Sequence, residues 1–155
     1  VLQNVEGHVV FDDVCFSYAG REDAPALQGV TLRIPAGNTC ALVGHSGSGK
    51  STMVNILLRF YTPQSGTVML DGQDIQGLDV NSLRSKMALV EQEPMLFGTT
   101  IFENITYGST RTITQEEVEH AARLANVHSF ITGFPEGYQT QVGTRGAQLS
   151  GGQKQ

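Results

Sequence analysis

The sequence has no long apolar run. Its longest candidate, MVNILL at Met53 to Leu58, ends at Arg59 and is far shorter than the roughly 18 apolar residues that a membrane-spanning helix requires. The first residues lack both a basic leader and the apolar core of a signal peptide, and no initiator Met is present. We therefore expect a chain that does not cross a bilayer and that is an excised piece of a longer protein.

Basic residues and cysteines are also few. The chain has 10 Lys and Arg against 15 Asp and Glu, a formal net charge of -5, so it lacks the positive field that holds a nucleic-acid backbone. We expect no nucleic acid as a partner. Cys15 and Cys40 stand in apolar, strand-like runs without CxxC spacing, which predicts small buried thiols in a reducing compartment and neither a metal ligand nor a nucleophile.

The residues that are present fit one folded domain. A chain of 155 residues can bury about 70 % of its unfolded surface in a single core. Hydrophobic residues make up 39 % and charged residues 16 % of the sequence, which is typical of folded domains and not of disordered chains.

The first part of the chain predicts strands, a glycine loop and a helix. Apolar alternation predicts strands at residues 9–16 and 30–34, and the continuous apolar run at residues 39–43 is typical of a strand buried on both faces. A helix is predicted by four apolar residues at helical spacing: Met53, Ile56, Leu57 and Phe60. A strand, a glycine loop and a helix therefore follow one another between residues 39 and 60.

The second part predicts two further strands and then helices. Residues 67–70 form a short strand before the hairpin turn signal Asp71-Gly72, and residues 87–92 form the next apolar strand. Thr114 and Glu117 form a capping box. They open a helix with one apolar face, made of Val118, Ala121, Ala122 and Ala125. The final residues stop where another helix is about to begin, so the second half is predicted to be a helical insert.

Residues 44–52 read GHSGSGKST and match the phosphate-loop pattern GxxxxGK[ST]. The pattern stands between a predicted buried strand and a predicted helix, which is the context that such a site requires. Gly44, Gly47 and Gly49 allow the backbone to bend so that successive N–H groups face an anion, and the helix adds its positive N-terminal end.

The side chains that follow complete the predicted nucleotide site. Lys50 can reach the β and γ phosphates, Ser51 can offer its hydroxyl to Mg²⁺, and the N–H of Thr52 can face a phosphate. The side chains of His45, Ser46 and Ser48 are predicted to act only as spacers. The loop backbone, including that of Ser46 and Ser48, is predicted to contact the nucleotide. The competing interpretation is a Gly/Ser turn that leaves Lys50 solvated.

A phosphate loop does not by itself separate ATPases, GTPases, kinases and DNA-linked motors. Three further segments do: FSY ending at Tyr18, VEQEPMLF at residues 90–97 and LSGGQ at residues 149–153. Together they resemble, nearly end to end, the nucleotide-binding domain of an ATP-binding cassette (ABC) transporter, most closely the exporter subfamily that includes P-glycoprotein.

The resemblance implies a role for each segment. Tyr18 looks like the A-loop aromatic residue that stacks on adenine, a contact of roughly 1 to 3 kcal/mol. Gln92 looks like the Q-loop residue, which contacts Mg²⁺ and the attacking water. The signature motif faces the γ phosphate held by a partner cassette, and Ser150 can cap a helix there; the motif residues are Ser150, Gly151, Gly152 and Gln153.

The resemblance also implies a fold and partners. We expect an α/β fold: a P-loop NTPase (RecA-like) core with an antiparallel β subdomain and a helical insert, truncated before the Walker B strand. Residues 1–92 would hold the β subdomain and P-loop core, and residues 93–155 the Q-loop, helical subdomain and signature motif. ATP and Mg²⁺, a second nucleotide-binding domain paired head to tail, and a transmembrane domain at the cytoplasmic face of a membrane are the implied partners.

The family continues with a Walker B Asp, a catalytic Glu and a switch His, which are not found here. Asp71 and Glu91 each follow an apolar run, but the first precedes a Gly turn and the second lies in the Q-loop strand. We therefore expect the chain to bind nucleotide better than it hydrolyses it, and the strand at residues 39–43 to lack sheet neighbours.

Three alternatives stay open. A soluble ABC ATPase acting in DNA repair or translation shares the phosphate loop and signature, although the exporter-like Q-loop argues against it. A GTPase or small-molecule kinase is the second, but no NKxD guanine-reading motif occurs. A non-catalytic nucleotide-binding regulator is the third. Thr144 departs from the exporter pattern, which usually has Glu there, and this bears on coupling to the transmembrane domain.

Overall fold

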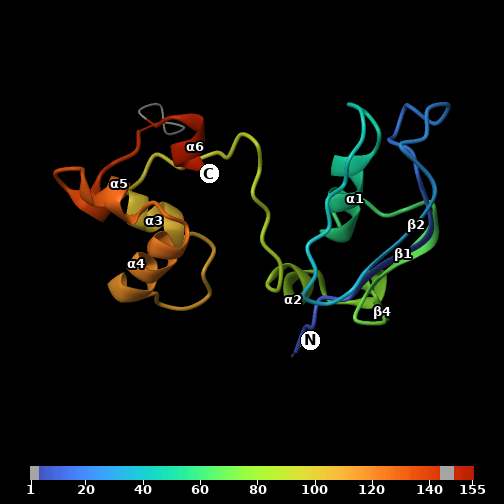
Figure 1. The fold of residues 1–155 in the computed structure, drawn as a ribbon, viewed down its shortest axis with the longest axis horizontal. Coiled ribbons are helices and arrows are strands. Elements are labelled where there is room, and N and C mark those ends of the chain that lie inside the picture. The colour runs from blue at the N-terminus through green and yellow to red at the C-terminus, as the bar shows by residue number, and fades with distance from the viewer. Residues whose placement is uncertain (1–3, 144–148) are drawn as a thin grey trace. The chain divides into compact units, whose positions relative to one another are not determined.

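The computed structural model describes residues 4–143 and 149–155. By its internal contacts the chain divides into two compact units, Val1–Ala88 and Leu89–Gln155. The first carries the strands and the second carries a group of short helices (Figure 1).

The first unit is built on a four-stranded antiparallel sheet in the order β2-β1-β3-β4. Its strands are β1 (Val9–Phe16), β2 (Leu27–Ile34), β3 (Ser65–Leu70) and β4 (Gln73–Asp74). Val9 of the central strand β1 lies opposite Ile34 on one side and Leu70 on the other. The strands predicted near residues 9–16, 30–34 and 67–70 are therefore confirmed.

One face of this sheet packs against α1 (Lys50–Leu57), whose Ile56 is fully buried. The core includes Phe11 and Val14 from β1 and Leu70 from β3, together with Leu83 from α2 (Val80–Arg84). Each such side chain contributes about 1.5–3 kcal/mol when removed from water. The predicted helix is thereby confirmed, and Met53 and Ile56 fix it against the sheet.

The C-terminal end of α1 is fixed by a side chain from α2. Arg84 Nε donates to the Leu58 carbonyl oxygen at 2.9 Å, and its Nη2 donates to the Arg59 carbonyl oxygen at 3.0 Å. The guanidinium also lies 4.8 Å from the centre of the Phe60 ring. A cation at carbonyl groups that have no partner inside the helix is favourable, so Arg84 stabilises the C-terminal end of α1.

The hairpin turn between β3 and β4 follows its sequence signal. Asp71 has φ 50° and Gly72 has φ 76°, the left-handed pair that a two-residue type I′ turn requires. The Asp71 carboxylate accepts hydrogen bonds from the backbone N–H groups of Glu6, Gly7 and His8. Asp71 thus anchors the chain before β1, as expected of a turn residue rather than a Walker B acid.

Two predicted strands are wrong. Residues 39–43 and 87–92 form no strand, and Val43 and Val90 are 88 % and 72 % exposed. A strand buried on both faces needs neighbours on both edges, and the antiparallel sheet is the only one among the described residues. Cys40 is exposed, contrary to prediction, while Cys15 is partly buried in β1.

The second unit is helical. Its elements are α3 (Ile101–Thr106), α4 (Gln115–Leu124), α5 (His128–Thr132), the 3₁₀ turn Gly137–Gln139 and α6 (Gly151–Lys154). The core contains Ile101, Val118, Ala122 and Ile131, whereas Ala121 and Ala125 on the predicted apolar face are exposed. None of the helices that the structure describes has the length and apolar character to span a bilayer.

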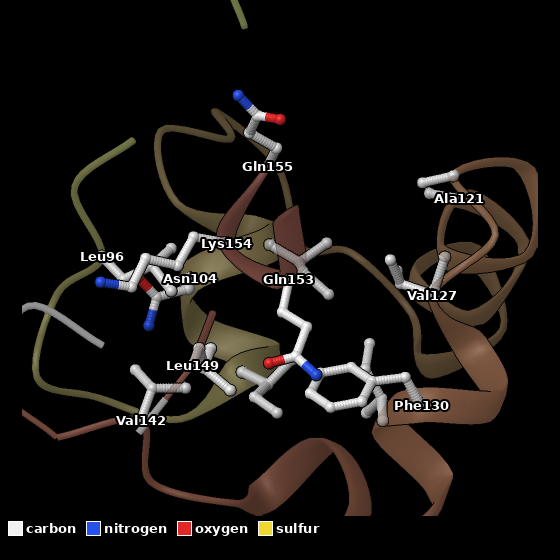
Figure 2. A pocket seen from close by; sticks show the side chains of 15 residues that line it. Leu96, Asn104, Ala121, Val127, Phe130, Val142, Leu149, Gln153, Lys154 and Gln155 are labelled. Carbon is white, nitrogen blue, oxygen red and sulfur yellow. The ribbon is translucent and has the colours of Figure 1, made fainter. Parts of the chain in front are cut away.

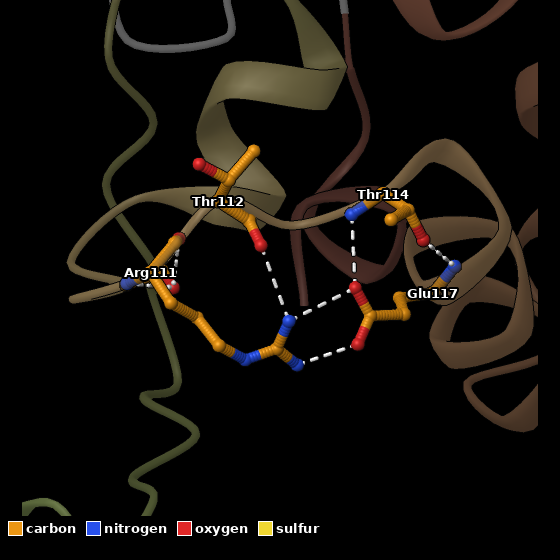
Figure 3. A network of polar contacts seen from close by, with 5 residues as sticks. Arg111, Thr112, Thr114 and Glu117 are labelled. Carbon is orange, nitrogen blue, oxygen red and sulfur yellow. Dashed lines mark hydrogen bonds and ion pairs between the residues drawn. The ribbon is translucent and has the colours of Figure 1, made fainter.

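The helix predicted after Thr114 begins with the expected capping box, and an arginine strengthens it (Figure 3). The Glu117 carboxylate accepts from Arg111 Nη1 at 3.0 Å, from Arg111 Nη2 at 2.5 Å and from the Thr114 N–H at 2.9 Å. The hydrogen bonds from Arg111, and after them the one from the Thr114 backbone, lower the pKa of Glu117 to about 2.

This network predicts an acid-sensitive start to α4. Because the pKa of Glu117 is lower in the folded chain than its ordinary 4.5, its stabilisation is complete above about pH 4.5 and is lost as the pH falls toward about 2. We expect Glu117→Gln to flatten the pH dependence of thermal unfolding, followed by helical circular dichroism, in this window. Glu116→Gln is the control, since the Glu116 side chain has no hydrogen-bond partner among the described residues. Equal profiles for both variants would contradict the assignment.

Candidate nucleotide-binding site

The loop at residues 44–49 runs directly into α1. Gly47 and Gly49 have φ 84° and 87°, a left-handed conformation that glycine adopts without strain. The Ser48 N–H donates to the His45 carbonyl oxygen at 3.2 Å, and the Met53 N–H donates to the Gly49 carbonyl oxygen at 3.0 Å. The helix therefore starts at Gly49, with the N–H groups of its first turn available to an anion.

Gly49 is also required by space. A Cβ at this position would lie 2.5 Å from the Ala26 carbonyl oxygen and 2.7 Å from Leu27 Cδ2. The close approach brings the loop against the start of β2. Glycine here serves packing as well as backbone conformation.

The Lys50 ammonium lies inside the loop. Its Nζ donates to the carbonyl oxygens of Gly44 at 2.9 Å and His45 at 2.8 Å, and to Ser48 Oγ at 3.2 Å. All three acceptors are neutral, so a phosphate oxygen would be a stronger partner for the same cation. The loop thus holds a cation on two backbone carbonyl groups and one hydroxyl.

A cavity of about 720 Å³ opens beside this loop, within the size range of small-molecule sites. It is lined by two stretches: one runs from the turn after β1 to Gln28 in β2, and the other is the phosphate loop with the first turn of α1. From the first comes Tyr18, whose hydroxyl lies 3.0 Å from Thr52 Oγ1. The structure therefore brings together Tyr18 and the loop residues from Ser46 to Thr52.

The remaining predicted site residues belong to the second unit. Gln92 is exposed, and its carbonyl oxygen accepts from Gln155 Nε2 at 3.2 Å. Ser150 caps α6 as predicted: its Oγ accepts from the Gln153 N–H at 3.4 Å, and Gln153 Oε1 accepts from the Ser150 N–H at 2.8 Å. Gly151 and Gly152 are exposed in the same short helix. Thr144 lies outside the described residues.

The sequence profile of the ABC transporter family matches residues 27–155. The chain belongs to this family. The match covers the phosphate loop, α1 and the helical unit, whereas Tyr18 lies before the matched residues.

The curated relatives are B-family and multidrug ABC transporters. The chain is 52 % identical over 153 residues to ABC transporter B family member 3 of Dictyostelium discoideum and 54 % identical over 154 residues to ABC transporter B family member 19 of Arabidopsis thaliana. It is 50 % identical over 162 residues to the ABC multidrug transporter atrD of Emericella nidulans. Each match covers 99 % of this chain but only 11 to 12 % of the relative.

A solved structure agrees with the fold. The chain superposes on a bacterial Atm1-family ABC exporter with ATP bound with a TM-score of 0.91 and 42 % identity, covering 99 % of this chain and 26 % of that one. The fold is therefore the ABC ATPase type of P-loop NTPase, as expected. The relatives favour the exporter interpretation over a soluble ATPase of DNA repair.

Sequence reasoning missed part of the ABC site. Arg21, Asp23 and Gln28 also line the cavity. For Arg21 and Asp23 the charged stretch after Tyr18 was the available signal, but an exposed run of charges is usually only solvated; Gln28, in β2, had no such signal. Its contribution depends on how the turn after β1 folds back toward the phosphate loop.

The donor set fits a magnesium ion carried in by a nucleotide. Ser51 is exposed in the first turn of α1 and lines the cavity, and Mg²⁺ commonly takes one or two protein ligands together with substrate phosphates. No group of three or more His, Cys, Asp or Glu that could hold a metal occurs among the described residues. The Ser51 hydroxyl would thus act with phosphate oxygens.

The helical unit has a cavity of its own, of about 280 Å³ (Figure 2). Leu96, Val127, Phe130 and Leu149 line it, with Gln153 from the signature motif. This lining is largely apolar and carries no cluster of ionisable groups. The chemistry therefore belongs to the phosphate-loop cavity.

Proposed function

We propose that the chain is the ATP-binding domain of an ABC exporter and contributes to ATP-driven transport across a membrane. The proposal rests on one observation: the Lys50 ammonium is hydrogen-bonded to carbonyl oxygens of the phosphate loop, and it lies at a cavity that Tyr18 also lines. The similarity to B-family and multidrug transporters and to an exporter with ATP bound supports the same nucleotide and process.

The proposed binding mode places the phosphates at the phosphate loop and the base at Tyr18. Phosphate oxygens replace the carbonyl groups at Lys50 Nζ and accept from the loop N–H groups. The contacting backbone belongs to Gly44, Ser46, Gly47, Ser48, Gly49 and Thr52. The Tyr18 ring stacks on adenine, a contact that tolerates other bases.

ATP hydrolysis is a transfer of the γ phosphoryl group to water, in which the chain positions groups rather than forming covalent bonds. By resemblance to the family, Ser51 and Gln92 would hold Mg²⁺, which would supply positive charge to the phosphates. Gln92 also orients the attacking water. None of the residues proposed here acts as a general base, so we expect the chain by itself to bind ATP with little hydrolysis.

Partner assignments rest on the family. Ser150, Gly151, Gly152 and Gln153 face the γ phosphate held by a second nucleotide-binding domain, so that binding of ATP and pairing are coupled. A transmembrane domain of the same transporter holds the pair at the cytoplasmic face of a membrane and receives the closing motion. The exposed position of Gly151 and Gly152 is consistent with a contact to another domain.

A nucleotide titration tests the proposal. We expect saturable calorimetric binding of MgATP, competed by MgGTP because base stacking is tolerant. Bound ATP should also raise the melting temperature, because ATP at 100 times its Kd increases the free energy of unfolding by about 2.7 kcal/mol. A strict preference for GTP would favour the GTPase alternative, and no saturable ATP binding would overturn the proposal.

A further inference from the structure

Tyr18 lies in a cluster of three aromatic rings. Its ring centre is 4.9 Å from that of Phe16, at an interplanar angle of 83°, and 5.2 Å from that of Tyr61, at 87°. Both are edge-to-face arrangements, which are favourable for aromatic pairs. The third pair, Phe16 and Tyr61, is 5.4 Å apart. Two rings thus constrain Tyr18 from two directions.

The hydroxyl end of Tyr18 is held separately. Its oxygen lies 3.0 Å from Thr52 Oγ1, and Thr52 is only 5 % exposed in the first turn of α1. A hydrogen bond to a buried group on a packed helix leaves the phenol little freedom. The ring is therefore fixed both along its sides and at its tip while it still lines the cavity.

We propose that Tyr61 and the Thr52 hydroxyl are positioning residues that orient Tyr18 for the nucleobase. The inference rests on the proposed function, because it concerns how the same site holds adenine. Ordering a mobile aromatic side chain on binding would weaken affinity, and a ring that is ordered beforehand avoids this cost. Neither residue needs to touch the base.

The expected effect is confined to the base end of the ligand. Loss of one edge-to-face contact corresponds to about a twofold to tenfold weakening of binding. Tyr61 has no hydrogen bond to the loop in the structure, whereas Lys50 is held by Gly44, His45 and Ser48. The affinity for a ligand that consists of phosphates alone should therefore not depend on Tyr61.

The test measures affinity for MgATP and for magnesium tripolyphosphate, which has no base, on the protein at its natural length. We expect Tyr61→Ala to weaken MgATP binding twofold to tenfold and leave tripolyphosphate unchanged, and Tyr61→Phe to behave like the parent. Phe60→Ala is the matched control, because the neighbouring Phe60 is 52 % exposed and packs on Arg84 instead.

The outcomes separate the inference from the function. If the parent binds MgATP and Tyr61→Ala binds it equally well, only the inference is overturned. Equal weakening of both ligands would show a merely structural role and overturn it too. Absence of MgATP binding by the parent overturns the function and the inference together.

A double-mutant cycle examines the hydroxyl contact. Tyr18→Phe keeps the ring and Thr52→Val keeps the backbone N–H, so each removes one partner of the same hydrogen bond. We expect each to weaken MgATP binding about twofold to tenfold and the double variant to be no weaker than the worse single variant. If the double variant instead lost affinity by the product of the two single losses, the proposed role of the Tyr18–Thr52 hydrogen bond would be overturned.

Discussion

Lys50→Ala is expected to weaken MgATP binding about 10- to 100-fold. Hydrogen bonds that involve a charged group contribute about 1.5–3 kcal/mol, and each 1.4 kcal/mol is a factor of ten in affinity. The Lys50 ammonium already occupies the centre of the loop, within 2.8–2.9 Å of two carbonyl oxygens. Removing it takes away the cation that the phosphates would meet there.

The measurement is a calorimetric titration with MgATP, and the control removes one positive charge elsewhere in the same unit. Arg33→Ala serves this purpose, since Arg33 is exposed on β2 and does not line the cavity. We expect Arg33→Ala to keep the parent affinity, because exposed charges at a distance are screened by salt. Unchanged affinity in Lys50→Ala would contradict the proposed nucleotide site.

The parts of the fold that could be predicted from sequence are those with local causes. The alternation in β1, the spacing of Met53 and Ile56 in α1, and the Asp71-Gly72 turn each act within a few residues. Capping boxes act over three residues, and the one at Thr114 forms as predicted. Such features need no knowledge of the tertiary fold.

The errors come from features with distant causes. The apolar runs at residues 39–43 and 87–92 satisfy a strand pattern, but a strand also needs a partner, and the pattern says nothing about whether one is adjacent. Cys40 is exposed for the same reason. Hydrophobic composition predicts that a segment can be buried and not what buries it.

The candidate site shows the same division. The motif located the phosphate loop and Ser150 as a helix cap, both of which depend on a few consecutive residues. It did not reveal that Lys50 binds the carbonyl groups of its own loop. Nor did it reveal that Tyr61, far along the chain, packs against Tyr18, because that contact arises only when the end of α1 returns to β1.

Gly66→Ala is expected to reduce the free energy of unfolding by about 2–5 kcal/mol. Gly66 in β3 has φ 79°, and a left-handed conformation costs an alanine about 1–2 kcal/mol. A Cβ there would also meet the carbonyl oxygens of Asp12, at 2.5 Å, and Asp13, where β1 and β3 change register. Crowding in a packed region adds about 1–3 kcal/mol.

Gly72→Ala separates the two contributions. Gly72 has a similar φ of 76°, but no atom lies within 4 Å of its added Cβ. It should therefore lose only the conformational part, about 1–2 kcal/mol, in urea unfolding of the same protein. The excess in Gly66→Ala measures how closely β3 must approach β1, the strand that leads into Tyr18. Equal losses in the two variants would mean that β1 yields to the added methyl group, and that the close approach of β3 to β1 does not require glycine.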